Sequence, residues 1–143
     1  MANILKKIFT VFKSLNESNL FYNSDRIVSS SVSEKAKIYS KYFISHSTIG
    51  DYTYIAENSR IDLTSIGKFC SIGPNVTCGW GIHPTNGIST SPMFYSTRKQ
   101  NGFSLSSTDK ITERKKISIG NDVFIGMNAV ILDGVTIGDG AII

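Results

Sequence analysis

The most regular feature of the chain is a branched aliphatic residue that recurs every six positions. Two shorter steps of five residues, after Ile44 and Ile61, make successive sets of three begin 17 residues apart. The full series is Val32, Ile38, Ile44, Ile49, Ile55, Ile61, Ile66, Ile72 and Cys78, then Ile119, Ile125, Ile131, Ile137 and Ile143. A period of six matches neither a helix nor a simple alternating strand. It predicts an all-β fold, a parallel β-helix with one short strand per hexapeptide, three hexapeptides per turn and the aliphatic pointing inward.

Two further positions of the repeat agree with this interpretation. Glycine often follows the aliphatic directly, and a small or β-branched residue recurs four positions after it, with Tyr42 as the exception. The glycines are Gly50, Gly67, Gly73, Gly120, Gly126 and Gly138; the small residues are Ala36, Thr53, Ser59, Ser65, Cys70, Val76, Val123, Ala129, Val135 and Ala141. We expect the glycines to serve tight corners, where a positive φ is often needed. Cys70 and Cys78 occupy inward positions and are expected to be small core residues.

The repeat divides the chain into an N-terminal segment, residues 1–30, and a β-helix domain, residues 31–143. Ile4, Ile8, Phe12 and Leu15 fall on one helical face, which predicts an amphipathic helix that packs on the coil or on a neighbouring subunit. The alternative is a weak membrane contact through the nearby lysines. No stretch approaches the roughly 20 apolar residues that span a bilayer, and no signal-peptide cleavage site is present, so we expect a cytoplasmic protein. The repeat stops in mid-coil at Ile143, which predicts that C-terminal coils are missing.

Residues 79–118 interrupt the repeat with a long loop, and loops of this length are usually functional or disordered. This one is rich in aromatic residues, and its six basic and two acidic residues account for the whole net charge of +4. That charge indicates either a solvated surface or attraction of an anionic ligand. At the root of the loop, Gly81-Ile82-His83-Pro84-Thr85 carries one of the two histidines. The other, His46, lies within the regular repeat and is expected at a coil corner.

Three segments together resemble a known family. They are residues 66–74 (Ile-Gly-Lys-Phe-Cys-Ser-Ile-Gly-Pro), Gly81-x-His83-Pro84-Thr85, and Val123-Phe124-Ile125-Gly126. In this combination the sequence resembles the xenobiotic acetyltransferase branch of the hexapeptide-repeat acyltransferases, over roughly residues 30–143. That branch includes chloramphenicol and streptogramin acetyltransferases and many sugar O-acetyltransferases. The resemblance implies left-handed coiling, homotrimers, acetyl-CoA as the donor, and active sites between neighbouring subunits.

The resemblance also implies roles for individual residues. His83 matches the general base, and neutral imidazole has a pKa suited to removing a hydroxyl proton near pH 7. The backbone at Gly126 and Met127 would face the pantetheine arm of the donor. An acceptor pocket would be shaped by Trp80, Asn86, Phe94, Tyr95 and Tyr54. The alternative interpretation is that the loop aromatics anchor the loop and that Tyr54 is an exposed strand residue.

The leading hypothesis is therefore an acetyl-CoA-dependent O-acetyltransferase acting on a sugar or surface-polysaccharide precursor. Antibiotic-modifying members usually carry polar residues after the position of Tyr54, where this chain has Ile55-Ala56, so an antibiotic acceptor is the alternative. A γ-type carbonic anhydrase requires three histidine ligands, and this chain has two histidines. A non-catalytic β-helix binding module is the remaining alternative. No metal and no nucleic-acid partner are expected.

Overall fold

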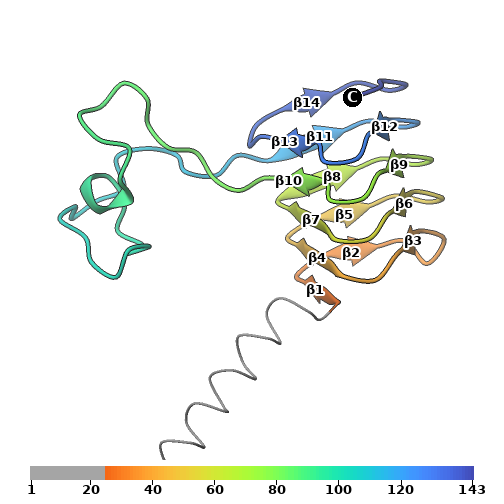
Figure 1. Ribbon diagram of the computed structural model, residues 1–143, viewed down its shortest axis with the longest axis horizontal. Helices are drawn as coiled ribbons and strands as arrows, with labels where there is room; N and C mark the ends of the chain where they lie inside the picture. The colour runs from red at the N-terminus through yellow and green to blue at the C-terminus, as the bar shows by residue number, and fades with distance from the viewer. Residues whose placement is uncertain (1–24) are drawn as a thin grey trace, which may run out of the picture.

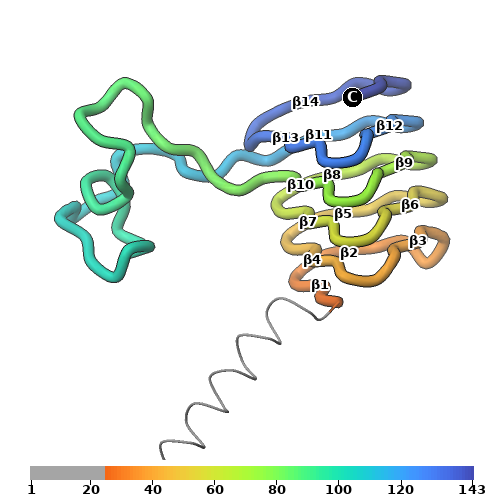
Figure 2. The backbone as a smooth tube through the Cα atoms, in the orientation of Figure 1, coloured from red at the N-terminus to blue at the C-terminus, as the bar shows by residue number. Residues whose placement is uncertain are grey.

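The computed structural model describes residues 25–143, so the helix predicted around Ile4 to Leu15 lies outside the described residues. Within that range, short strands wind into three parallel sheets, which Figures 1 and 2 show as stacked turns of one coil. The first sheet contains, in order, β1 (Arg26–Val28), β4 (Tyr42–Ser45), β7 (Ser59–Asp62), β10 (Thr77–Cys78) and β13 (Val130–Ile131). The second contains β2 (Ser31–Val32), β5 (Thr48–Ile49), β8 (Thr64–Ile66), β11 (Ile117–Ile119) and β14 (Thr136–Ile137). The third contains β3 (Lys37–Ile38), β6 (Tyr54–Ile55), β9 (Ser71–Ile72) and β12 (Phe124–Ile125).

The register of the sheets stacks each aliphatic residue on its copy one turn away. Ile44 pairs with Ile61 in the first sheet, and Ile55 pairs with Ile72 in the third. Because every pairing is parallel and keeps this register, the repeated side chains form three apolar columns inside the coil. The predicted parallel β-helix is confirmed.

The core is made almost entirely of these columns. Their central members, from Ile44 to Ile131, are buried. Cys70 and Cys78 are both fully buried among them, as predicted, and burial raises the pKa of the Cys78 thiol to about 12. With so high a pKa, Cys78 forms almost no thiolate near neutral pH, and both cysteines serve as small core residues.

The five-residue steps place their small residue differently from the prediction. After Ile61 the buried residue is Thr64, at 1% exposure, whereas Ser65 is half-buried and bonds the neighbouring Thr48 hydroxyl on the outside. Ser47 takes the same inward position after Ile44 and donates its hydroxyl to the Ser45 carbonyl. The step from Ile61 to Ile66 has five residues where most steps have six, so the inward small residue comes three positions after the aliphatic and not four. The prediction that Ser65 takes this position was therefore wrong by one residue.

The glycines after the aliphatic residues are required for a different reason from the one predicted. Positive φ values occur two or three positions after the aliphatic, as at Tyr52 and Phe69, and not at the glycines that follow it. A Cβ added to Gly67 would lie 2.5 Å from the carbonyl oxygen of Gly120 on the next turn. A Cβ on Gly50 would lie equally close to the Gly67 carbonyl oxygen. Glycine is therefore needed there because the turns of the coil approach each other closely, and the prediction that these glycines serve corners with positive φ was wrong.

The long loop leaves the coil after β10 and returns to it at β11. Figure 1 shows it projecting sideways, well clear of the three sheets. It contains one short 3-10 helix, η1 (Pro92–Phe94), and is otherwise irregular. On its return, β11 pairs with β8 in the register Ile66 to Ile119, so the column of aliphatic residues continues as though the loop were absent.

Candidate active site

His83 lies near the root of the loop with one ring nitrogen held and the side chain exposed. Its Nδ1 atom is 2.9 Å from the carbonyl oxygen of Thr90 and 2.8 Å from the hydroxyl of Tyr95. A carbonyl oxygen accepts hydrogen bonds and never donates them, so the contact with Thr90 requires the proton to be on Nδ1. In the neutral ring, this leaves the lone pair on Nε2 free to accept a proton from another molecule.

The root of the loop is fastened to the coil by one buried carboxylate, Asp133. One of its oxygens accepts the backbone N–H groups of Trp80 and Gly81, both at 2.8 Å, and the other accepts the Lys115 N–H at 3.1 Å. The Asp133 side chain is 1% exposed, and Arg114 Nε donates to it at 2.9 Å. Burial pushes its pKa up, but the hydrogen bonds from Gly81, Arg114, Lys115 and Trp80 outweigh burial and hold the pKa below its ordinary value.

Arg114 extends the same fastening to a second turn of the coil, because its Nη2 atom donates to Asp62 on β7 at 2.6 Å. Gly79, where the loop departs, has a φ of +69°, and a Cβ there would lie 2.7 Å from the Asp62 carbonyl oxygen. The segments where the loop leaves and rejoins the coil are thus hydrogen-bonded to Asp62 of β7 and to Asp133 after β13. His83 follows two residues after this anchor and takes its position from it.

A second buried carboxylate, Glu113, organises the interior of the loop. It accepts the Ser96 hydroxyl at 2.5 Å and the Gln100 amide at 2.6 Å, and Arg98 lies 3.8 Å away. The backbone carbonyl of Glu113 also accepts the N–H of Ile82, the residue before His83, at 2.8 Å. The loop is therefore held by polar contacts to specific side chains.

Two pockets lie on either side of the His83–Tyr95 contact. The smaller, of about 270 Å³, is lined by His83 together with Trp80, Arg98 and Glu113, among others. The larger, of about 490 Å³, is mostly apolar and its lining includes Tyr95 but not His83. Its residues are Pro84, Asn86, Gly87, Ile88, Ser89, Phe94, Tyr95, Lys110 and Ile111.

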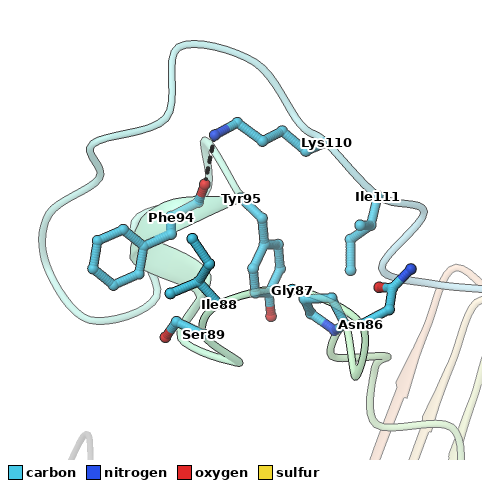
Figure 3. Close-up of a pocket in the computed structure, with 9 residues that line it drawn as sticks. Asn86, Gly87, Ile88, Ser89, Phe94, Tyr95, Lys110 and Ile111 are labelled. Atoms are coloured by element: carbon cyan, nitrogen blue, oxygen red, sulfur yellow. Dashed lines mark hydrogen bonds between the residues drawn. The ribbon is translucent and has the colours of Figure 1, made fainter.

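Figure 3 shows the larger pocket, with Tyr95 in the middle of the lining, Phe94 and Ile88 to its left, and Asn86 and Ile111 to its right. The Lys110 ammonium group donates to the Phe94 carbonyl oxygen at 2.9 Å, which closes one side. Of the residues predicted to shape an acceptor pocket, the structure thus brings three together here.

The other predicted site residues lie elsewhere. Trp80 is beside His83 in the smaller pocket, and its ring lies against the Arg60 guanidinium at 4.4 Å. Tyr54 is an exposed residue of β6 in the third sheet, and Gly126 and Met127 directly follow β12 of the same sheet. In Figure 1 this sheet is at the right and the loop at the left, so within one chain these residues and His83 do not meet.

The second histidine and the anchoring residues complete the comparison with the sequence. His46 has a positive φ of 47° at a coil corner, as predicted, and its Nδ1 atom lies 2.8 Å from the Ser45 hydroxyl. No motif or repeat position in the sequence marks Thr90, Asp133 or Glu113 as part of the site. Asp133 stands two residues after Ile131, as Asp51 does after Ile49, so its place in the repeat does not distinguish it from other corner residues.

Two features are absent from the described part of the chain. Among residues 25–143, no group of three or more His, Cys, Asp and Glu side chains is arranged to hold a metal ion. No helix in that range is long and apolar enough to cross a membrane.

Comparisons with known proteins agree with the repeat and the loop motif. Residues 116–143 match the family model described as bacterial transferase hexapeptide (six repeats). The chain is 36% identical over 118 residues to a chloramphenicol acetyltransferase from Agrobacterium fabrum, covering 76% of this chain and 53% of that protein. It is 37% identical over 109 residues to a chloramphenicol acetyltransferase from Morganella morganii, covering 73% and 51% respectively. The chain thus spans about half the length of these relatives.

One solved structure also aligns with the chain. It is a hexapeptide-repeat-containing acetyltransferase from Vibrio cholerae, 20% identical, with a TM-score of 0.40 over 87% of this chain and 64% of that one, a likeness too weak to support a conclusion. The repeat and the two acetyltransferase relatives confirm the resemblance predicted from the sequence. The chain belongs to the hexapeptide-repeat acetyltransferase family.

Proposed function

We propose that the protein is an acetyl-CoA-dependent O-acetyltransferase with His83 as its general base. The observation that carries the proposal is the contact of His83 Nδ1 with the Thr90 carbonyl, because it leaves Nε2 free and fixed in orientation. His83 Nε2 would accept the hydroxyl proton as the new oxygen–acetyl bond forms. It would then return that proton to sulfur as the acetyl–sulfur bond breaks, which balances the transfer.

The donor side of the proposal rests on the corner after β12. Met127 is 64% exposed there. The N–H of Gly126 donates to the Ile143 carbonyl oxygen, and the same oxygen leaves little space for a side chain at Gly126. An exposed corner with a small residue lets an extended thioester arm lie along the backbone. Because this corner and His83 are far apart in one chain, we propose a homotrimer in which neighbouring subunits complete each site.

Two classes of acceptor are candidates. A sugar or surface-polysaccharide precursor is the first, because the Ile55-Ala56 segment after Tyr54 lacks the polar residues usual in antibiotic-modifying members. Chloramphenicol is the second, and two observations favour it. Both curated relatives carry its name, and the larger pocket beside Tyr95 has a mainly apolar lining that suits an aromatic acceptor better than a sugar.

The test is a thiol-release assay with acetyl-CoA and a panel of sugars, nucleotide sugars and chloramphenicol. His83→Ala should lower kcat/KM by about 100-fold or more, as expected when a general base is lost. His46→Ala is the matched control, since His46 is an exposed coil-corner histidine, and it should keep wild-type rates. Acetyl transfer that survives His83→Ala would contradict the mechanism. A stable monomer in size exclusion with light scattering would contradict the intersubunit site.

A further inference from the structure

Tyr95 is a buried residue that touches the exposed His83. It is 4% exposed, its ring meets the imidazole edge-on at a centroid distance of 6.1 Å, and its hydroxyl is 2.8 Å from Nδ1. The backbone of Tyr95 is fixed on both sides. Its N–H donates to the carbonyl of Pro92, the first residue of η1, and its carbonyl accepts the Lys110 N–H at 2.8 Å. The hydroxyl is therefore presented to His83 by a rigid support.

The two oxygens at Nδ1 determine which group donates. With the proton on Nδ1 directed at the Thr90 carbonyl, Nδ1 has no lone pair left to accept from the Tyr95 hydroxyl. The Tyr95 oxygen then serves as a second acceptor for the same N–H.

We propose that Tyr95 is a positioning residue whose hydroxyl oxygen holds Nδ1–H of His83 and stabilises the imidazolium formed during transfer. The inference rests on the proposed role of His83 as base. When Nε2 gains a proton, the ring becomes positively charged and its Nδ1–H bonds strengthen. Two oxygens then share the charge, which raises the proton affinity of His83 and keeps Nε2 aimed at the acceptor.

The charged groups around His83 do not change when this oxygen is removed. Arg98, Glu113 and Arg114 line the same pocket as His83, and Lys110 lines the larger pocket on the far side of Tyr95. Burial, and then the Glu113 carboxylate, raise the pKa of Tyr95, so the group at Nδ1 is a neutral phenol. Tyr95→Phe therefore removes one hydrogen-bonding oxygen and keeps the ring, the charge and the packing.

The first test is NMR titration of protein labelled with ¹⁵N-histidine, which gives signals from two histidines. In the wild type, neutral His83 should carry its proton on Nδ1; a proton on Nε2 would overturn the proposal without any variant. In Tyr95→Phe, the titration midpoint of His83 should fall by about half a pH unit to one pH unit, the effect of losing one hydrogen bond. His46 serves as the internal control and should not move. An unchanged or raised His83 midpoint overturns the proposal.

The second test is kinetic, with Tyr39→Phe as the matched control because Tyr39 is an exposed tyrosine after β3 that lines neither pocket. Tyr95→Phe should lower kcat about 3- to 10-fold, leave the KM of the acceptor unchanged, and move the acid limb of kcat/KM to lower pH. A rise in KM with unchanged kcat would mean that Tyr95 binds the acceptor and does not position His83. Since the NMR titration needs no turnover, an inactive wild type would contradict the proposed function while the NMR result still decides the role of Tyr95.

Discussion

The coil and the loop of this protein are held together by different kinds of contact. In the coil, most buried isoleucines stack on an isoleucine one turn away, and the backbone of each turn bonds to the next. In the loop, two buried carboxylates, Asp133 and Glu113, accept hydrogen bonds from residues far away in the sequence. The coil is thus stabilised by many equivalent contacts, whereas the shape of the loop depends on a few contacts that have no equivalent elsewhere.

This difference predicts which substitutions should destabilise the whole domain and which should affect the loop alone. Loss of an apolar contact in the coil should lower the stability of the whole domain, since neighbouring turns support one another. Loss of a polar contact in the loop should change the loop alone, because few apolar side chains link it to the core. Four predictions distinguish the coil from the loop.

The largest effect is expected from Ile61→Ala in the coil. Ile61 is fully buried, so its truncation should leave a cavity and lower the free energy of unfolding by about 2–5 kcal/mol. The measurement is chemical denaturation, with Val130→Ala as the control, since Val130 is 61% exposed in the same sheet. If both variants lose the same small amount, the inner columns do not provide the stability assigned to them.

A smaller global effect is expected from Gly67→Ala. The new Cβ would lie 2.5 Å from the Gly120 carbonyl and 2.7 Å from the Asn121 side chain, so adjacent turns must separate, at a cost of about 1–3 kcal/mol. Gly138→Ala is the matched control, because nothing lies within 4 Å of a Cβ at that position. Differential scanning calorimetry should show a lower Tm for the first variant only. Equal Tm values would show that the close approach of the turns is not what requires glycine.

Asp133→Asn is expected to have the smallest effect on the stability of the coil and the largest effect on the loop. An amide in place of the carboxylate presents N–H groups to the N–H donors of Trp80, Gly81 or Lys115, and it removes the charge that pairs with Arg114. Limited proteolysis should cut within residues 79–116 faster, at a cost of about 1–3 kcal/mol to the folded loop, while the Tm of the coil stays close to wild type. The control is Asp139→Asn, a carboxylate that accepts the Asn121 N–H within the coil. Faster cleavage in both variants would contradict a specific anchor.

The same anchor should depend on pH in a direction set by its lowered pKa. The pKa of folded Asp133 is below the ordinary value of 3.8, so its contribution is complete above that value and is lost as the pH falls through the lower folded pKa. Cleavage of the loop by pepsin should therefore stay slow near pH 4 and accelerate on further acidification. Asp133→Asn should weaken this dependence, and what remains is expected from Asp109, a loop carboxylate whose pKa is also lowered, by its hydrogen bonds from Thr97.

The fold could be predicted almost completely from the sequence, whereas the support of the site could not. The period of six fixes the sheets, the inward columns and the buried cysteines, because each turn repeats the same local requirement. The predicted role of glycine was wrong, because a Cβ at Gly67 meets the next turn of the coil, and a local pattern does not report on contacts between turns. Ser65 was misplaced because the shorter side of each turn shifts the inward residue to Thr64.

The contacts within the loop are the part of the structure that the sequence predicts least. A sequence motif singled out His83, but the partners of its Nδ1 atom, Thr90 and Tyr95, are brought to it by irregular backbone. Asp133 lies 52 residues from Gly81, and no periodic pattern links the two. Irregular structure of this kind depends on individual long-range contacts, which a single sequence does not reveal.

The pairing of β11 with β8 has a consequence for how such proteins diversify. Hydrogen-bonded partners on adjacent turns lie 17 residues apart within the uninterrupted coil and 53 apart across the loop, with an identical register in space. An insertion at this point therefore lengthens the chain without shifting any strand. Loops of different length and specificity can therefore be inserted between β10 and β11, by evolution or by design, while the coil keeps its geometry.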